Sequence, residues 1–409
     1  MKHKLLIIVL SLATLMMQAK KPKTGTYRAV LLLDAATGLE LPFNFDLGYK
    51  GKKPLITIRN ADERIVVEEI RQVKDSLIIK MPVFDTEFRL KVIGDTLVGH
   101  WINHYRKEKN KIPFKAVCGD NRRFTSDPGK PDPVFEGRWE VTFSPGTTSA
   151  SKAIGVFHHS EQTDFVTGTF LTETGDYRYL EGQKIGNQLW LSCFDGSHAF
   201  LFKAEFKDGA LVNGLFYSGA HWQEPWAAIR NPEFKLANPN DITLVKDPAM
   251  PISFSFQDLE GKTVTLKDQR YTNKPVIIQV MGSWCPNCMD ESAYFAEVYK
   301  QYRAAGLEII ALAFEKTTDQ DKARKQVLRL KQRFGIDYAI LLTLQTGKDK
   351  AQEVLPMLNK ITSFPTTLFL NKQHQVVKVH TGFSGPATGN DYLLFKQSTE
   401  LLIQKLLKD

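Results

Sequence analysis

Short runs of alternating apolar and polar residues, separated by turns, occupy residues 24–232. Residues 88–92, 200–206 and 211–216 are clear examples. Alternation with a period of two predicts half-buried strands, and turn pairs such as Gly94-Asp95 favour antiparallel hairpins. Because no stretch here has the apolar spacing of a long helix, we predict an all-β N-terminal region.

The pattern of this β region recurs at a constant spacing, which predicts two repeats. Residues 25–28 correspond to residues 137–140, and residues 76–79 correspond to residues 188–191. Each copy holds about eight candidate strands, enough for a small closed barrel. The pattern allows two lipocalin-like barrels in series or one larger fused sandwich. The predicted repeats are residues 24–119 and 134–232.

Beyond a proline-punctuated linker at residues 233–251, strand and helix patterns alternate from residue 252 to residue 409. The predicted strands are residues 253–257, 263–266, 276–281, 307–314, 338–343, 365–370 and 376–380. The predicted helices are residues 290–303, 322–333, 350–360 and 391–407. The last helix has mainly apolar residues at Leu394, Leu401, Ile403 and Leu407. This alternation predicts an α/β domain with a central mixed sheet covered on both faces.

Two cysteines stand where one of these strands passes into a helix, in Trp284-Cys285-Pro286-Asn287-Cys288. Pro286 is tolerated in the first turn of a helix, so Cys285 should lie at the helix N-terminus. The free N–H groups and the positive end of the helix dipole there favour a thiolate. Cys288, one turn further on, can attack a mixed disulfide formed on Cys285 and release the partner.

Two other roles for a C-x-x-C pair have to be weighed. Half of a zinc site would need two more ligands at comparable spacing, and Cys118 and Cys193 are isolated. A purely structural disulfide is the second alternative. We therefore expect a redox-active disulfide and no metal. Cys118 and Cys193 can form a bridge of their own only if their Cα atoms lie within about 7 Å.

The N-terminus has the pattern of a secretory signal at residues 1–19. Lys2 and Lys4 precede an apolar run at residues 5–15, and Ala19 fits the cleavage position. The run is shorter than the roughly 20 residues that span a bilayer. We expect a protein that is exported to the periplasm or cell envelope, soluble after signal cleavage, and placed where disulfides form.

The net charge of +9 does not change this expectation. The densest basic run, residues 322–333, also carries an apolar stripe. Such a run is typical of the solvated face of a packed helix, and we expect no nucleic-acid partner.

The C-x-x-C motif, the extra strands before it and Phe364-Pro365-Thr366-Thr367 resemble a TlpA-like thioredoxin-fold protein from Phe254 to about Leu407. The resemblance implies that Pro365 is cis and faces the two cysteines. It also implies that the backbone of Phe364 pairs with an extended substrate segment. Trp284 and Pro286 would complete the substrate-binding surface.

The resemblance favours the reducing direction, with disulfide-containing envelope proteins as partners and a membrane donor supplying electrons. No bound cofactor is expected, because the dithiol itself carries both electrons.

One departure from many thioredoxins concerns the proton that Cys288 must lose. The position of their buried acid, six residues before the first cysteine, is Gln279, which cannot accept a proton. Glu291 follows Cys288 by three residues, so both lie on one helix face. We predict that Glu291 relays this proton. Its alternative role is to complement the helix dipole. Glu315, after a later strand, is a weaker candidate.

Residues 345–360 lengthen the domain. Their apolar positions predict packing beside the Pro365 loop, where they shape the substrate groove or only fill space.

The function of the β region is less well marked. Its tryptophans are mostly core candidates, and its histidines lack metal spacing and are expected to be solvated on strands. The tryptophans are Trp101, Trp139, Trp190, Trp222 and Trp226, and the histidines are His158, His159, His198 and His221.

The first hypothesis is therefore an exported thiol–disulfide oxidoreductase. The main alternative is a β module that binds an envelope ligand or protein, with an accessory redox domain. A thiol peroxidase is a third hypothesis, which the adjacent resolving cysteine disfavours.

Overall fold

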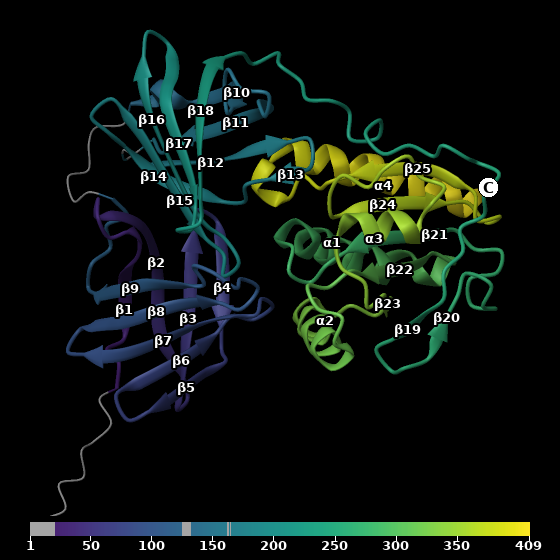
Figure 1. Cartoon of the computed structure of the whole chain (residues 1–409), viewed down its shortest axis with the longest axis horizontal. Coiled ribbons are helices and arrows are strands. Elements are labelled where there is room, and N and C mark those ends of the chain that lie inside the picture. The colour runs from purple at the N-terminus through teal and green to yellow at the C-terminus, as the bar shows by residue number, and fades with distance from the viewer. Residues whose placement is uncertain (1–20, 125–131, 162, 164) are drawn as a thin grey trace, which may run out of the picture.

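The structure of the chain is a computed structural model that describes residues 21–124, 132–161, 163 and 165–409. The predicted signal peptide at residues 1–19 lies outside the described residues. Figure 1 shows a β region on the left and a mixed α/β domain on the right, with the linker crossing above the space between them.

The first half of the β region is one nine-stranded antiparallel sheet in the order β4-β3-β2-β1-β9-β8-β7-β6-β5. Its first strand pairs with its last, and each other neighbour follows in sequence. The strands are β1 (Gly25–Asp34), β2 (Leu39–Lys50), β3 (Lys53–Asn60), β4 (Glu63–Val67), β5 (Ile70–Val73), β6 (Ser76–Lys80), β7 (Thr86–Ile93), β8 (Thr96–Asn103) and β9 (Lys111–Cys118).

The second half is another nine-stranded sheet, which β11 closes into a barrel by pairing with β12. Its first strand, β10, also pairs with its last, β18. A short 3-10 helix, η1 (Pro133–Phe135), precedes it. The strands are β10 (Gly137–Phe143), β11 (Ser151–His159), β12 (Phe165–Thr172), β13 (Gly175–Asp176), β14 (Leu180–Ile185), β15 (Gln188–Phe194), β16 (Ala199–Lys207), β17 (Ala210–Ser218) and β18 (Trp222–Arg230).

The N-terminal region is therefore all-β, with two barrel-like sheets. The core of the second sheet is dense in stacked and edge-on aromatic rings, such as Phe170 on Phe202 at 4.4 Å between centroids. Trp101, Trp139 and Trp226 are buried, but Trp222 is exposed, because it opens β18 next to a turn. The expectation that Trp222 belongs to the core is wrong in this respect.

The cysteine bridge that the sequence left open is absent, and two predictions on histidines of the β region need correction. Cys118 and Cys193 are free thiols: Cys193 lies in the core of the second sheet, whereas Cys118 ends β9 and contacts the carbonyl of Thr24. His198 is not a solvated strand residue. It is half-buried in a turn, and its Nδ1 lies 3.1 Å from Asp195 Oδ2. His221 is also a half-buried turn residue.

The C-terminal domain has a seven-stranded mixed sheet in the order β20-β19-β23-β22-β21-β24-β25. Strands β21, β22 and β23 are parallel, and β24 joins β21 antiparallel. The strands are β19 (Phe256–Asp258), β20 (Thr263–Val264), β21 (Val276–Met281), β22 (Glu308–Ala313), β23 (Ala339–Leu342), β24 (Thr366–Leu370) and β25 (Val376–Thr381). The helical segments are α1 (Pro286–Tyr302), η2 (Arg303–Ala305), α2 (Gln320–Phe334), α3 (Gly347–Val354), η3 (Pro386–Thr388) and α4 (Asn390–Lys408).

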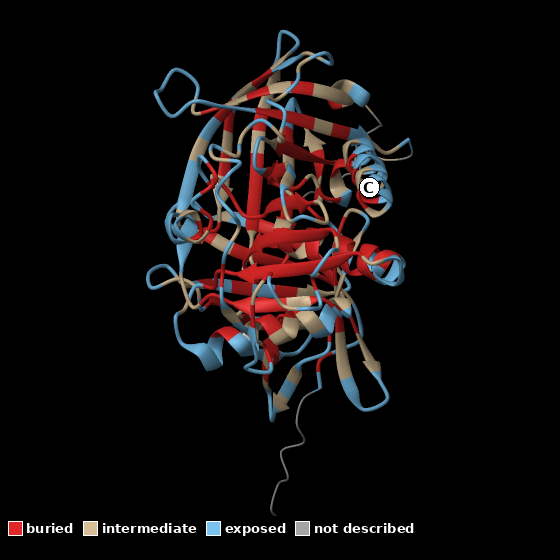
Figure 2. Cartoon of the chain, turned by 90° about the vertical axis from the view of Figure 1, so that its right-hand side faces the viewer, coloured by how far each residue is buried: buried red, intermediate tan, exposed pale blue. Residues whose placement is uncertain are grey.

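Strands β21 and β22 are buried along their whole length, as Figure 2 shows in red. Such continuous burial is expected of central strands covered on both faces. The predicted central mixed sheet is confirmed.

Two helix predictions need correction. The helix predicted at residues 350–360 ends at Val354, because Pro356 lacks an N–H donor and its ring restricts the residue before it. In α4, Leu394 and Leu401 are exposed, whereas Phe395, Ile403 and Leu406 are buried. The apolar face of α4 is thus rotated from the predicted one.

The linker packs on the C-terminal domain well before residue 252. Val245 bridges Leu358, Lys246 N donates to Met357 O (2.9 Å), and Thr243 is fully buried. Residues 355–361 therefore pack against the linker. The preceding helix, α3, contacts the Pro365 loop instead, because Lys348 Nζ donates to Thr362 O. Among the described residues, no helix combines the length and apolar character needed to cross a bilayer.

Candidate active site

The cysteine pair lies where β21 passes into α1. Gly282 ends the strand, and Cys285 takes the N-cap position in extended geometry before Pro286 begins the helix. Cys288 N donates to Cys285 Sγ at 3.3 Å, so the sulfur accepts one of the free N–H groups of the first turn. Both cysteines are thiols in this structure. The predicted position of Cys285 at the helix N-terminus is observed.

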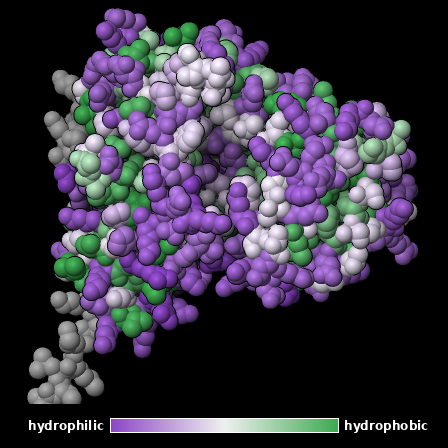
Figure 3. Space-filling view, in the orientation of Figure 1, coloured by the Kyte–Doolittle hydropathy of each residue, from purple (hydrophilic) through white to green (hydrophobic). Residues whose placement is uncertain are grey.

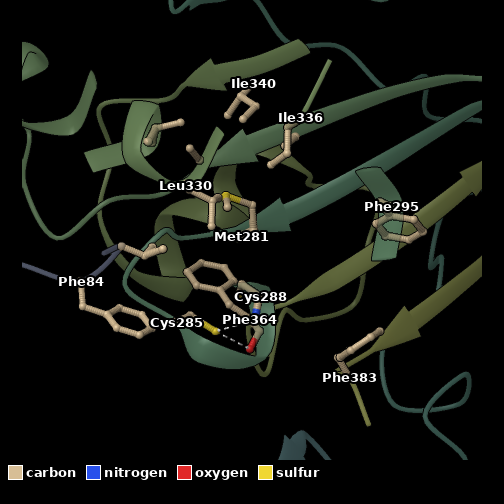
Figure 4. Packing of buried hydrophobic residues seen from close by; sticks show 14 of the residues in the cluster. Phe84, Met281, Cys285, Cys288, Phe295, Leu330, Ile336, Ile340, Phe364 and Phe383 are labelled. Carbon is tan, nitrogen blue, oxygen red and sulfur yellow. Dashed lines mark hydrogen bonds between the residues drawn. The ribbon is translucent and has the colours of Figure 1, made fainter. Parts of the chain in front are cut away.

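Cys285 also contacts the loop before β24. Its Sγ donates to Phe364 O at 3.5 Å, and the Phe364–Pro365 peptide bond is cis. Figure 4 shows Cys285 beside both Cys288 and Phe364, with both contacts drawn. The Trp284 indole lies edge-on to the Phe364 ring at 5.9 Å and donates to Phe314 O. The structure thus brings Trp284, Cys285 and the Phe364-Pro365 loop together.

Glu291 lies fully buried beneath the dithiol. Thr367 Oγ1 donates to its Oε1 at 2.8 Å, and Gln279 Nε2 donates to its Oε2 at 2.8 Å. Burial raises the pKa of Glu291 to about 8, although these two hydrogen bonds oppose the shift. With this pKa the carboxyl populates both its protonated and its ionised form near neutral pH, whereas an exposed glutamate is almost fully ionised there.

The strand register explains why these partners meet. Gln279 on β21 pairs opposite Thr367 on β24, and both side chains point to the same carboxyl of α1. Burial raises the pKa of the Cys288 thiol well above its usual range, and Cys285 and Glu291 add to the shift. Cys288 therefore needs a base to become a nucleophile at neutral pH.

Glu315 lies beside the motif and holds its backbone. Ser283 donates to it twice, from N at 2.8 Å and from Oγ at 2.7 Å. Burial raises the pKa of Glu315 to about 7, against those hydrogen bonds. Its observed contacts position the turn that leads to Cys285.

Sequence reasoning missed the contact of Thr367 with Glu291 and the presence of Lys316 at the site. Thr367 stands two residues after Pro365, and its role depends on pairing with Gln279, which no local pattern indicates. Lys316 Nζ lies 3.8 Å from the centre of the Trp284 ring. Burial lowers the pKa of Lys316, while the nearby Cys285 opposes that shift.

The β region also reaches this site, which no sequence signal indicated. Phe84 and the dithiol belong to one apolar cluster. Arg178 forms an ion pair with Asp290, two residues beyond Cys288.

Comparison with known proteins agrees with this geometry. Residues 244–393 match the Redoxin family. These residues are a Redoxin domain. The thiol–disulfide oxidoreductase ResA of Halalkalibacterium halodurans is 29% identical over 142 residues, covering 35% of this chain and 72% of that protein. ResA of Bacillus subtilis is 28% identical over 141 residues, covering 34% and 70%.

Among solved structures, StoA from Bacillus subtilis is similar to this chain at 19% identity and a TM-score of 0.27. The match covers 37% of this chain and 99% of StoA. The Redoxin domain carries thioredoxin-like oxidoreductase activity, as the family match and the ResA homologues indicate. The match starts at residue 244, inside the predicted linker, and does not extend into the β region.

Proposed function

We propose that this chain is an exported thiol–disulfide oxidoreductase that reduces disulfides of envelope proteins through Cys285 and Cys288. The observation that carries the proposal is the N-cap geometry of Cys285. Its sulfur accepts the Cys288 N–H at 3.3 Å at the positive end of α1. That arrangement stabilises a thiolate, which is the nucleophile in disulfide exchange.

The reaction proceeds in two exchange steps. The Cys285 thiolate attacks one sulfur of the substrate disulfide, breaks the S–S bond and expels the other sulfur as a thiolate. Cys288 then loses its proton and attacks Cys285 Sγ, which releases the second substrate thiolate and leaves a Cys285–Cys288 disulfide. Two electrons pass from the dithiol to the substrate, and a donor dithiol must later return them.

Glu291 handles the proton of Cys288 in this proposal. In its ionised form it accepts that proton during the second step. In its protonated form it can return the proton when the enzyme disulfide is reduced again. A pKa of about 8 makes both forms accessible near neutral pH.

The substrate would dock on Trp284, Pro286, Phe364 and Pro365. The backbone of Phe364 lies within hydrogen-bond distance of Cys285 Sγ, so a segment paired with that backbone would bring its disulfide to the reactive sulfur.

Export rests on the sequence of the first 19 residues. We infer that envelope proteins with disulfides are the substrates and that a membrane donor supplies the electrons. The proteins named ResA are thiol–disulfide oxidoreductases, which supports the reaction class.

The alternative, a ligand-binding β module, has less support. The cavity among the apolar side chains of the first sheet measures about 10 Å³. A small-molecule site needs about 300 Å³ or more. An open hollow of about 600 Å³ between the two sheets, lined by Arg28, Trp190 and Tyr217 among others, makes binding at the outer surface of the β region the form of this alternative that an experiment should test.

We also propose that the β region arose by duplication, with repeats at residues 24–119 and 134–232, and that the linker at residues 233–251 joins it to a thioredoxin-like domain at residues 252–409. Corresponding glycines, Gly25 and Gly137, open β1 and β10. In both sheets the first strand pairs with the last, which supports the proposal.

Equilibration of the Cys285–Cys288 couple with glutathione tests the main proposal. A potential near ~−270 mV supports a reductase, and one near ~−120 mV would make the protein an oxidant. A Cys288→Ser variant should accumulate mixed disulfides with several envelope proteins. Capture of a single partner that still binds the Cys285→Ser variant would favour the binding module instead.

A further inference from the structure

A loop of the β region lies beside the reactive sulfur. Cys285 is only 8% exposed, and Phe84, from the loop between β6 and β7, is only 2% exposed. Figure 4 shows the Phe84 ring beside Cys285 and Phe364. All three belong to one apolar cluster that joins the first sheet to the Redoxin domain. A substrate disulfide needs this same space, because it must approach Cys285 Sγ directly.

The loop that carries Phe84 is held from the side of the β region. Asp85 N donates to Tyr105 Oη at 2.9 Å, and Thr86 Oγ1 donates to Gly196 O at 2.5 Å. Met81 packs closely on Gly196, where an added Cβ would lie 2.4 Å from Met81 Cε. Phe84 is therefore fixed in place by contacts with both sheets.

A second segment of the β region contacts the motif itself. Gly175 in β13 contacts Asn287, which stands between the two cysteines in the sequence. A Cβ added to Gly175 would lie 1.9 Å from Asn287 Nδ2. Asp176 Oδ2 accepts from Gly385 N at 2.6 Å. Gly382 of the Redoxin domain also approaches the β region closely. A Cβ added to it would lie 2.6 Å from the carbonyl carbon of Thr174.

Buried charges stabilise the contact between the β13 segment and the Redoxin domain. Arg178, 1% exposed, pairs with Asp290 of α1 and with Glu63 of the first sheet, and its Nε lies 3.6 Å from Asp195. Burial opposes the charge of Arg178, but the three carboxylates hold its pKa above its usual range. One guanidinium thus joins both β sheets to the helix that begins at the cysteine pair.

We call the contact between the β region and the Redoxin domain the seam. Two further ion pairs cross it near its edge. Arg329 of α2 pairs with Glu69 at 2.7 Å, and Arg138 of β10 pairs with Asp391 of α4 at 3.0 Å. Figure 3 shows a largely hydrophilic outer surface where the two regions meet.

We propose that the β region closes the substrate-docking face of the Redoxin domain, so that protein substrates reach Cys285 only after the Phe84 loop and the β13 segment move away. The inference rests on the proposed function. Closure and opening are two states of one chain, and a substrate shifts the balance because it binds only the open state. The Arg178–Asp290 ion pair and the Phe84 contact favour the closed state.

Alkylation of Cys285 in a Cys288→Ser background tests this proposal. The probe is iodoacetamide, and the modified peptide is identified by mass spectrometry, since Cys118 is partly exposed. Phe84→Ala should raise the alkylation rate of Cys285 by about tenfold or more. Phe234→Ala, an aromatic truncation in the linker, is the matched control and should leave the rate unchanged. Circular dichroism checks that each variant is folded.

A second measurement avoids mutation of the interface. Cys288→Ser protein trapped as a mixed disulfide with insulin should exchange amide hydrogens faster at residues 81–85 and 174–178 than the free protein. Equal alkylation of the Phe84→Ala variant and the control, or unchanged protection in the trapped complex, would overturn the closure. If the closure is overturned but the Cys285–Cys288 dithiol of the unmodified protein still equilibrates with glutathione, the oxidoreductase proposal survives without the closure. Failure of the Cys285–Cys288 couple to equilibrate, both in the unmodified protein and in a Phe84→Ala protein that retains Cys288, removes the proposed function itself.

Discussion

The buried arginines of the β region and the two carboxyls beside the dithiol differ in the partners that they have. In the β region, buried arginines are fixed by several partners: Arg123 bonds to Ser192 Oγ and O and to Arg59 O, and Arg178 meets three carboxylates. In the Redoxin domain, no cation of the described residues is in hydrogen-bond contact with the buried Glu291 or Glu315, and burial raises the pKa of each. The difference separates permanent charges that hold sheets together from carboxyls that can exchange protons.

The comparison predicts that substitutions in the Redoxin domain remove chemistry and that substitutions in the β region remove stability or change access. Four changes test this division, each with a control variant.

Loss of Cys285 should have the largest effect. Cys285→Ser should reduce insulin disulfide reduction by about 10³-fold or more, because the attacking thiolate is gone. The melting temperature should change little. Turbidity of reduced insulin follows the rate, and Cys118→Ser should keep full activity. Comparable losses in both variants would contradict the assignment of the nucleophile.

Arg123→Ala should be the most damaging change in the β region. It leaves Glu181, Asn60 and the Ser192 carbonyl without their buried partner, at a cost of about 3–5 kcal/mol in the free energy of unfolding. Urea denaturation measures this. Arg122→Ala, which removes an exposed neighbour paired with Asp120, should cost below about 1 kcal/mol. The per-molecule rate of folded Arg123→Ala protein should stay normal; a rate loss as large as that of Cys285→Ser would break the division.

Glu291→Gln should slow the second exchange step by about 10²-fold at pH 8, since Cys288 loses its base. In the unmodified protein this step should accelerate as pH rises through about 8, because only ionised Glu291 accepts a proton. The glutamine variant should lack that inflection and accelerate only at higher pH, where Cys288 ionises unaided. Stopped-flow decay of a preformed mixed disulfide reports the step.

The matched control for that change is Glu297→Gln, which alters an exposed glutamate of the same helix. An inflection near pH 8 that persists in Glu291→Gln protein would assign the proton transfer to another group, with Glu315 the next to test.

The smallest effect is expected at the edge of the seam. Glu69→Gln breaks an ion pair whose carboxylate is more than half exposed, so the free energy of unfolding should fall by less than about 1 kcal/mol. Chemical denaturation gives the value, with Glu68→Gln, next to it on the same loop, as the control. A loss of several kcal/mol would mean that the seam is a permanent contact and would weaken the contrast between the regions.

Much of the Redoxin domain could be predicted from local patterns. A strand, a glycine, C-x-x-C and a helix lie adjacent in the chain, so the N-cap position of Cys285 follows from spacing alone. The proximity of Glu291 to Cys288 follows likewise from the helical repeat. Where a local breaker was overlooked, as at Pro356, the predicted helix ran too far.

The sequence by itself determined an all-β region, a C-terminal α/β domain, and the order of chemical groups around one helix terminus, because these depend on residues close together in the chain. Only the tertiary structure decided that Thr367 meets Glu291, that α4 exposes Leu394 and Leu401, and that Phe84 and Arg178 reach the dithiol. Those contacts join residues far apart in the chain, and they depend on strand register and on how separate sheets pack, which no local pattern of apolar and polar residues specifies.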